Sequence, residues 1–241
     1  MARKRRGKEQ TLEVSRQEIK FQLNPVQYVR LAHSLENVLL EDKHNGDFGY
    51  PVRSLYFDSF ADTDFFQKMA GEENRKKIRL RTYDPDAKQV KLEIKRKFNN
   101  DQIKKSVWVE REDALALINC DYEVLREYES PSAQMLYEIM HVNRVRPVTL
   151  IEYNRKAFIH PTNNIRITLD TDIRASETCF DFFGHDPVLT PVEEFAFALA
   201  EVKFNGFLMG WLSELLSDYG FNRSAYSKYA VARSMLEQFL T

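Results

Sequence analysis

Basic residues recur at every second position in several short segments of this chain. Arg79 and Arg81 alternate with Ile78 and Leu80. Side chains two positions apart in a β-strand point to the same face, so such a segment presents one charged face and one apolar face. The same alternation is found in four other segments: 16–23, 90–97, 165–174 and 201–204. Arginine can donate two parallel hydrogen bonds to phosphate oxygens, which makes phosphate a natural ligand for these faces.

The number of such segments is what points to a ligand. For one strand alone, the simpler interpretation is the solvated face of a one-sided sheet. A solvated face usually mixes both charges, whereas lysine and arginine recur here on several strands. Because like charges placed opposite one another are destabilising, the pattern predicts a polyanion that neutralises them.

A few carboxylates stand among these cations. They are Glu18, Glu93, Asp170, Asp172 and Glu201. Carboxylates would be misplaced in a site for anions alone, but Mg²⁺ and Mn²⁺ prefer oxygen ligands and often share them with substrate phosphates. The sequence therefore predicts that Mn²⁺ or Mg²⁺ bridges carboxylate and phosphate.

Other chemical sites find little support in the sequence. The five histidines are scattered without an H-E-x-x-H motif, and no P-loop or G-x-G-x-x-G run occurs. Cys120 and Cys179 lack C-x-x-C spacing, so neither a disulfide framework nor a zinc site is indicated. Trp108 and Trp211 are expected in packing contacts, and the charges alternate with apolar residues instead of forming an exposed basic patch with aromatics. We therefore expect no nucleic-acid partner.

The segments that carry these residues alternate with helical patterns. Strands are expected at 15–23, 53–58, 78–83, 90–97, 105–109, 148–159, 165–174 and 199–204. Helices are expected at 24–39, 62–69, 112–118, from about 130, at 207–218 and at 224–239. Ser227 and Lys228 would then lie in the first turn of the last helix, where free N–H groups favour an anion.

These elements predict an α+β fold with about eight long, mostly antiparallel strands. If the sheet closes into a barrel, the charged columns point into its lumen and the helices cover the apolar outside. Residues 1–12, rich in lysine and arginine, are expected to form a disordered basic tail, and residues 13–241 a single domain. No membrane-spanning run or signal peptide is apparent, so we expect a cytoplasmic protein.

Eight short pieces of the sequence resemble, in order, the VTC domain, which is the polyphosphate polymerase domain of the triphosphate tunnel metalloenzyme or CYTH-like superfamily. They are 16–20, 53–58, 77–81, 92–96, 152–155, 166–172, 201–203 and 227–229. The resemblance implies an eight-stranded antiparallel β-barrel, the triphosphate tunnel, with a basic lumen and flanking helices. It also implies transfer of the γ-phosphate of ATP to a polyphosphate chain, with release of ADP.

The resemblance implies roles for individual residues. The expected catalytic set is Lys20, Arg79, Arg81, Lys95, Arg155, Arg166 and Lys203. The expected phosphate-binding set is Arg53, Lys105, Tyr153, Ser227 and Lys228. The expected metal ligands are Glu201, Glu93 and Asp170. The expected ligands and partners are ATP, triphosphate and polyphosphate, and a separate membrane protein could couple synthesis to transport.

One departure from the superfamily separates the functional alternatives. Hydrolase and cyclase members begin with a Glu-x-Glu-x-Lys strand, but Arg16 replaces the first glutamate here. The loss of one carboxylate argues against a two-metal phosphohydrolase and favours the polymerase. The alternatives are a CYTH-type hydrolase of inorganic triphosphate or nucleoside triphosphates, and a polyphosphate-binding sensor domain without catalysis.

Overall fold

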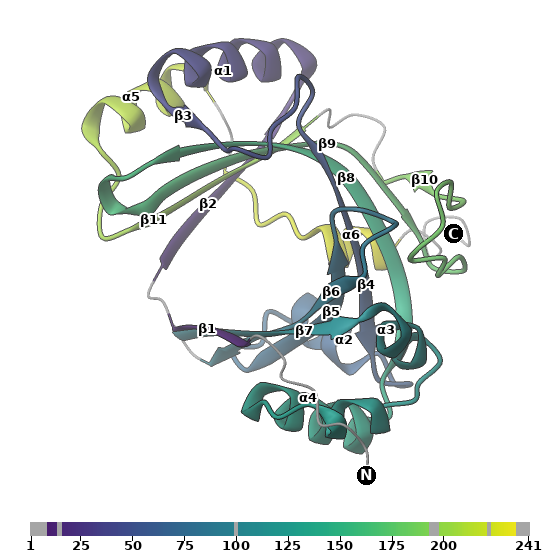
Figure 1. Ribbon diagram of the computed structural model, residues 1–241. Helices are drawn as coiled ribbons and strands as arrows, with labels where there is room; N and C mark the ends of the chain where they lie inside the picture. The colour runs from purple at the N-terminus through teal and green to yellow at the C-terminus, as the bar shows by residue number, and fades with distance from the viewer. Residues whose placement is uncertain (1–8, 14–15, 99–100, 193–197, 221–222, 235–241) are drawn as a thin grey trace.

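The computed structural model describes residues 9–13, 16–98, 101–192, 198–220 and 223–234. Within them, one antiparallel sheet curves around a central space, with α1, α3, α4 and α5 outside it and α6 inside (Figure 1). We call the side of the sheet that points into this space the inner face. The opposite side is the outer face.

Eight strands of the described chain are eight residues or longer, as the sequence predicts. They are β2 (Arg16–Leu23), β4 (Tyr50–Asp58), β5 (Arg75–Thr82), β6 (Gln89–Phe98), β7 (Asp101–Glu110), β8 (Arg146–His160), β9 (Ile165–Ser176) and β11 (Ala198–Asn205). Three short strands add to them: β1 (Glu9–Glu13), β3 (Leu40–Glu41) and β10 (Thr190–Pro191). The helices are α1 (Pro25–Val38), α2 (Thr63–Met69), α3 (Arg111–Ile118), α4 (Pro131–Asn143), α5 (Gly210–Asp218) and α6 (Lys228–Arg233), with 3₁₀ turns at Glu123–Glu127 and Thr162–Asn164.

The expected closed barrel is not found among the described strands. The hydrogen-bonded order is β1-β7-β6-β5-β4-β8-β9-β11-β2, so β1 and β2 form the two edges of an open sheet. They are neighbours in sequence, but β1 pairs with β7 and β2 pairs with β11. The expected tail boundary also needs correction, because residues 9–12 belong to β1; residues 1–8 lie outside the described chain.

Two apolar clusters cover the outer face, as expected from the alternation. One packs α3 and α4 against β4 to β7, with Leu80, Leu92 and Leu136 fully buried. The other packs α1 and α5 against β2, β9 and β11, with Leu35 and Ile167 fully buried. Burial of these side chains supplies the main driving force for holding the helices on the sheet.

The first helix shows how closely local sequence signals can be followed. Asn24 caps α1 by accepting a hydrogen bond from the backbone N–H of Gln27, whose side chain accepts from the backbone N–H of Asn24. Pro25 occupies the first helical position, where no N–H is needed. The predicted start of this helix is therefore confirmed.

The last helix differs from the outer ones because it packs on the inner face. Tyr229 and Ala232 of α6 contact Val52, Tyr56 and other residues of β4, β8 and β9. The Tyr229 hydroxyl donates a hydrogen bond of 2.7 Å to the buried carboxylate of Asp58. Of the expected helix at 224–239, residues Lys228–Arg233 are helical, and 235–241 lie outside the described chain. None of the described helices has the length and hydropathy needed to cross a bilayer.

Candidate functional site

Three lysines face one another across adjacent strands on the inner face. Lys77 of β5 is in register with Lys95 of β6, and Lys95 is in register with Lys104 of β7. Like charges in directly opposed positions repel. A row of three is therefore a feature that an anionic ligand would stabilise.

The acid–base properties of these lysines agree with that interpretation. Burial, together with the charges of Lys20 and Lys68, lowers the pKa of Lys77 to about 7. Burial also lowers the pKa of Lys104 to about 8, although Glu93 acts against the shift. A buried ammonium group that lacks enough negative charge around it loses its proton more easily. A bound polyanion would raise both pKa values again.

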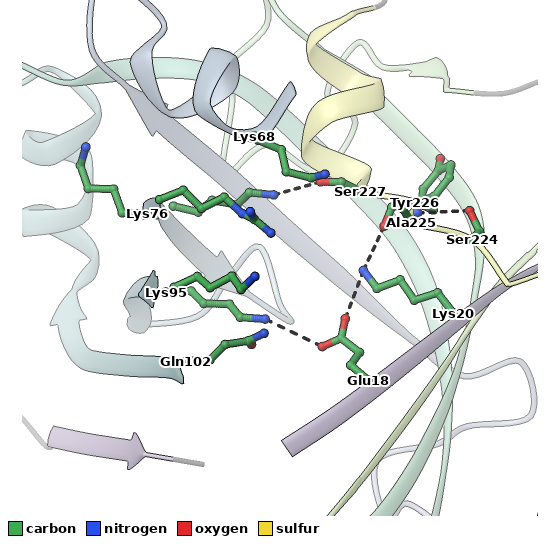
Figure 2. Close-up of a pocket in the computed structure, with 13 residues that line it drawn as sticks. Glu18, Lys20, Lys68, Lys76, Lys95, Gln102, Ser224, Ala225, Tyr226 and Ser227 are labelled. Carbon is green, nitrogen blue, oxygen red and sulfur yellow. Dashed lines mark hydrogen bonds and ion pairs between the residues drawn. The ribbon is translucent and has the colours of Figure 1, made fainter. Parts of the chain in front are cut away.

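Two of these lysines, Lys77 and Lys95, line a cavity of about 320 Å³ between β5, β6, β2 and the segment 224–227. Figure 2 shows Lys95, Lys68 and Lys20 around it. Seven of the lining residues are basic and only Glu18 is acidic; the basic ones are Lys20, Lys68, Arg75, Lys76, Lys77, Lys95 and Lys97. The cavity therefore has the charge and the size for a chain of several phosphate groups.

Ser227 and the backbone before it shape the wall opposite the lysines. Lys77 Nζ donates to Ser227 Oγ over 2.9 Å, and Lys20 Nζ donates to the Tyr226 carbonyl over 3.0 Å. Ser227 is also the N-cap of α6, since its side chain accepts from the backbone N–H of Ala230. Ser227 therefore lies beside Lys77 at the start of α6, and its role in binding phosphate stays a prediction.

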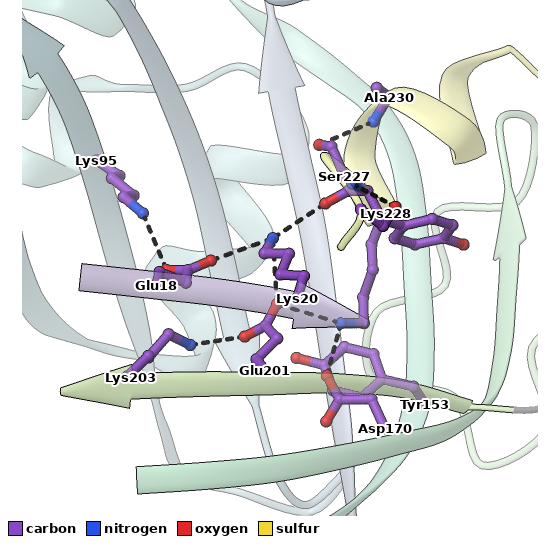
Figure 3. A network of polar contacts seen from close by, with 12 residues as sticks. Glu18, Lys20, Lys95, Tyr153, Asp170, Glu201, Lys203, Ser227, Lys228 and Ala230 are labelled. Atoms are coloured by element: carbon purple, nitrogen blue, oxygen red, sulfur yellow. Dashed lines mark hydrogen bonds and ion pairs between the residues drawn. The ribbon is translucent and has the colours of Figure 1, made fainter. Parts of the chain in front are cut away.

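Two carboxylates meet at Lys20 on the other side of the inner face (Figure 3). Lys20 Nζ lies 3.1 Å from Glu18 Oε1 and 3.3 Å from Glu201 Oε1. Glu201 also binds Lys203 Nζ at 2.6 Å. Burial alone would raise the pKa of Glu201, but Lys203, Lys228 and Lys20 hold it well below its ordinary value. Both carboxylates are ionised and point to one cationic position.

Asp170 forms the centre of a neighbouring ion-pair network. Arg155 binds it with two hydrogen bonds of 2.6 and 2.7 Å, and Lys228 Nζ binds it at 2.6 Å. Asp170 is fully buried. The Tyr153 ring lies 4.7 Å from Lys228 Nζ and further shields the group. This network fixes the positions of Arg155 and Lys228 before any ligand binds.

Glu93 has a similar position on the facing wall. Arg79 binds its carboxylate at 2.7 Å, and Lys104 contacts the other oxygen. Burial opposes ionisation, but Arg79, Arg81 and Lys104 lower the pKa of Glu93 strongly. Arg79 also donates to Tyr56 Oη over 2.9 Å. Arg79 and Arg81 of β5 are thus held with their guanidinium groups on the inner face.

Arg166 lies farther along the inner face, in register with Lys203. Its guanidinium group binds Asp42 at 2.7 Å and Tyr50 Oη at 3.1 Å. Asp42 belongs to the connection between β3 and β4, so Arg166 anchors that connection to β9. It shares the face with the other cations but is already paired.

Arg53 is not on the inner face, which corrects the expectation that it binds phosphate. It shares the outer face with Leu55 and Phe57. Its guanidinium group binds Glu152 at 2.6 Å and donates to the carbonyls of Phe182 and Gly184. The alternation within 53–57 already predicts the outer face for Arg53, because Arg53 lies two and four positions from the apolar Leu55 and Phe57.

Lys105 is likewise on the outer face, where it shares a side with Val107 and Val109 of the outer cluster. Its neighbour Lys104 takes the inner position. The sequence interpretation also left Lys77 out of the site. In a strand, residues an odd number of positions apart lie on opposite faces. Lys77 and Lys104 stand at odd distances from the buried outer-face residues of β5 and β7, and this signal would have placed both on the inner face.

The three expected metal ligands, Glu93, Asp170 and Glu201, are all paired with lysine or arginine, and their role in metal binding stays a prediction. Glu93 is held by Arg79 and Lys104, and Asp170 by Arg155 and Lys228. Within the described chain, no three histidine, cysteine or acidic residues form a group that could hold a metal. Glu201 and Glu18 do converge, and one or two carboxylates suffice for Mg²⁺ when substrate phosphates complete its coordination.

Comparison with known proteins places this geometry in a family. The model of the VTC domain matches residues 15–237. A search of curated proteins gives no match. A putative adenylate cyclase from Bacillus halodurans aligns with a TM-score of 0.54 and 11% identity, over 95% of this chain and 100% of that one. The putative adenylyl cyclase HpAC1 from Hippeastrum, described as having a dominant triphosphatase activity, aligns with a TM-score of 0.56 and 16% identity, over 92% and 96%.

At these identities the two structural neighbours show a common fold. The family model, in contrast, covers nearly the whole described chain. This chain belongs to the VTC domain family.

Proposed function

We propose that this protein is a metal-dependent polyphosphate polymerase that transfers the γ-phosphate of ATP to a polyphosphate chain bound on the inner face. The observation that carries the proposal is the row of Lys77, Lys95 and Lys104 beside a cavity with seven basic residues and one acidic residue. A single triphosphate would leave part of this charge unmatched, whereas a chain of phosphates extends along it.

The reaction needs little covalent chemistry from the protein. A terminal oxygen of the acceptor chain attacks the γ-phosphorus of ATP, the bond to the bridging β,γ-oxygen breaks, and ADP leaves with the electron pair. Such transfers are catalysed mainly by positioning and charge neutralisation. Of the described residues that line the cavity, six are lysines, one is an arginine, and none is a cysteine or a histidine.

The residues of the inner face divide this work. In this proposal Lys77, Lys95 and Lys104 bind the acceptor chain, while Arg79 and Arg81 bind the transferred phosphate. A bound Mn²⁺ or Mg²⁺, held through Glu201 and Glu18, would neutralise developing charge on the phosphate oxygens. The other proposed site residues, Arg155, Lys228 and Tyr153, keep the donor end rigid through the network at Asp170.

Hydrolysis of triphosphates is the second candidate. The likeness to a Hippeastrum protein described with a dominant triphosphatase activity favours it. Arg16 in place of a glutamate counts against it, because a second carboxylate for a two-metal site is missing. A sensor domain that binds polyphosphate without turnover is the third candidate, and it would use the same lysines.

The test is incubation of the purified protein with ATP and Mn²⁺ or Mg²⁺, followed by an ADP assay and a gel stained for polyphosphate. Arg79→Ala and Lys203→Ala should lose activity. Lys156→Ala is a matched control, because Lys156 lies on the outer face of β8 and pairs with Glu36 of α1. ADP with acid-stable polymer supports the polymerase.

Two other results would reassign the protein. Phosphate release from tripolyphosphate or ATP without polymer would make it a hydrolase. No turnover, combined with a rise in melting temperature on addition of tripolyphosphate, would make it a sensor.

A further inference from the structure

A second cavity of about 490 Å³ lies on the outer face at the ends of β5, β6 and β7. Its apolar lining includes Ile94, Ile103 and Met135 of α4, with the exposed ring of Phe98 at its border. Five basic residues surround this lining: Arg75, Lys76, Arg96, Lys97 and Lys105. No acidic residue lines it within the described chain. We call this feature the outer groove.

The outer groove adjoins the inner cavity at three shared residues. Arg75, Lys76 and Lys97 line both of them. In Figure 2, Lys76 points away from Lys20 and Glu18. A basic path therefore runs from the inner face over the ends of β5 and β6 to the outer face.

The cations of the outer groove differ in how far they are already neutralised. Lys76 pairs with Asp64 at 2.6 Å, and Arg75 donates to the carbonyl of Glu72. The structure shows no ion pair of Arg96, Lys97 or Lys105 with another residue of the described ranges. Their charge is available to an anion from outside.

We propose that a polyphosphate chain longer than the inner cavity continues over Arg75 and Lys97 into the outer groove, where Arg96 and Lys105 bind it. This inference rests on the proposed function, since it takes polyphosphate as the ligand of the inner cavity. In this inference Lys105 does bind phosphate, but it binds a distant part of the polyphosphate chain, on the outer face of the sheet.

The three basic residues that line both cavities favour polyphosphate over an acidic peptide. A flexible polyanion leaving the inner cavity meets the shared residues first and needs no separate encounter with the protein. The apolar floor strengthens ion pairs made above it, because it keeps water away from one side of each cation. The long aliphatic stems of arginine and lysine can lie along such a floor.

The test compares short and long ligands. Affinities for inorganic tripolyphosphate and for long-chain polyphosphate are measured for the wild type and for Arg96→Glu with Lys105→Glu. Two reversed charges, at the exposed Arg96 and the half-buried Lys105, should weaken long-chain binding by about tenfold and leave tripolyphosphate binding unchanged. The salt dependence of long-chain binding should also become shallower, because fewer counterions are released.

A control variant tests whether the loss of binding depends on the position of the reversed charges or only on the change in net charge. Lys88→Glu with Arg126→Glu changes net charge equally at exposed positions that line neither cavity, and it should leave both affinities nearly unchanged. If the glutamate variant fails to fold, Arg96→Gln with Lys105→Gln serves instead, with an expected loss of about threefold.

Three outcomes would overturn the inference. Long-chain affinity could be unaffected by the double substitution, or tripolyphosphate affinity could fall by the same factor. A polyglutamate peptide could compete with the wild type as strongly as polyphosphate does, which would make the groove a protein-binding site. Absence of polymer synthesis from ATP, in contrast, would refute the proposed function and leave a length-dependent loss of binding standing.

Discussion

The two walls of the inner face balance their charges differently. On the wall of β5 to β7, the lysine row and two arginines place five cations around one carboxylate: Lys77, Arg79, Arg81, Lys95 and Lys104 with Glu93. Arg75 and Lys97 add to this positive charge where they line the cavity. On the wall of β2, β8, β9, β11 and the start of α6, five cations accompany three carboxylates of these elements and Asp42 of the β3–β4 connection: Lys20, Arg155, Arg166, Lys203 and Lys228 with Glu18, Asp42, Asp170 and Glu201. We call these the lysine wall and the paired wall.

The difference separates two uses of buried charge. On the paired wall, each charge depends on its partner, and removing one partner leaves the other buried alone. On the lysine wall, the excess positive charge costs stability until an anion binds, which is common at functional sites. Substitutions should therefore affect mainly folding on the paired wall and mainly ligand binding on the lysine wall.

Arg155→Met should have the largest effect on stability. It leaves the fully buried Asp170 with Lys228 as its remaining partner. Loss of one member of such a network should lower the free energy of unfolding by about 3 kcal/mol, measured by denaturation in guanidinium chloride. Combining it with Asp170→Asn should recover part of the loss, and a change below about 1 kcal/mol would end the distinction between the walls.

Lys77→Met should show the opposite balance. The neutral side chain removes one charge from the lysine row and one hydrogen bond to Ser227. Affinity for tripolyphosphate should fall about tenfold, while the free energy of unfolding changes by less than about 1 kcal/mol. Calorimetric titration and denaturation measure the two effects, with Lys156→Met as the control. Equal affinity in variant and wild type would remove Lys77 from the site.

Binding should also depend on pH through the lysine wall. The pKa values of Lys77 and Lys104 are about 7 and about 8 without ligand, and a polyanion favours the charged forms. Affinity for tripolyphosphate should therefore fall several-fold as pH rises from about 6.5 to about 9. The decline should be shallower in Lys77→Met; identical pH profiles would contradict the assignment.

The same lysines predict the opposite trend for the stability of the free protein. Their pKa values lie below the ordinary value near 10.4, so the unfolded state binds more protons between about pH 7 and pH 10. Their contribution to the free energy of unfolding therefore rises with pH over that range. Denaturation of wild type and Lys77→Met at pH 7 and pH 9 isolates the contribution of Lys77.

The smallest effects are expected from a comparison of two adjacent lysines. Lys104→Met on the inner face should weaken tripolyphosphate binding about threefold, because Lys104 also pairs with Glu93 and keeps only part of its charge for the ligand. Lys105→Met on the outer face should not change it. Equal losses at both positions would contradict the placement of Lys104 and Lys105 on opposite faces of β7.

Alternation with buried residues made most of the sheet predictable from the sequence. The segment Ile78–Arg81 has apolar and charged residues in strict turn, so its inner and outer faces follow from the period of a strand. The same rule applied to Arg53 and Lys105 would have placed them outside. Their expected roles came from motif similarity, which matches residue types in order but does not test the face on which a side chain lies.

Other features depend on pairings between distant segments. Whether β1 joins β2 depends on the pairing of two sheet edges, which no local pattern contains. The inner location of α6 was also not predictable, because an apolar helix face fits either side of a curved sheet. The pairing of Glu18 with Glu201 across Lys20 required the register of β2 with β11.

The length of β8 has a consequence for how the molecule opens. Its fifteen residues pair with β4 and β3 along one edge and with β9 along the other, so the same strand contributes to both outer clusters. Neither half of the sheet can then separate without breaking hydrogen bonds of β8. Backbone amides at the centre of β8, near Leu150 and Ile151, should therefore exchange with deuterium only through global unfolding, and they should report the stability of both halves together.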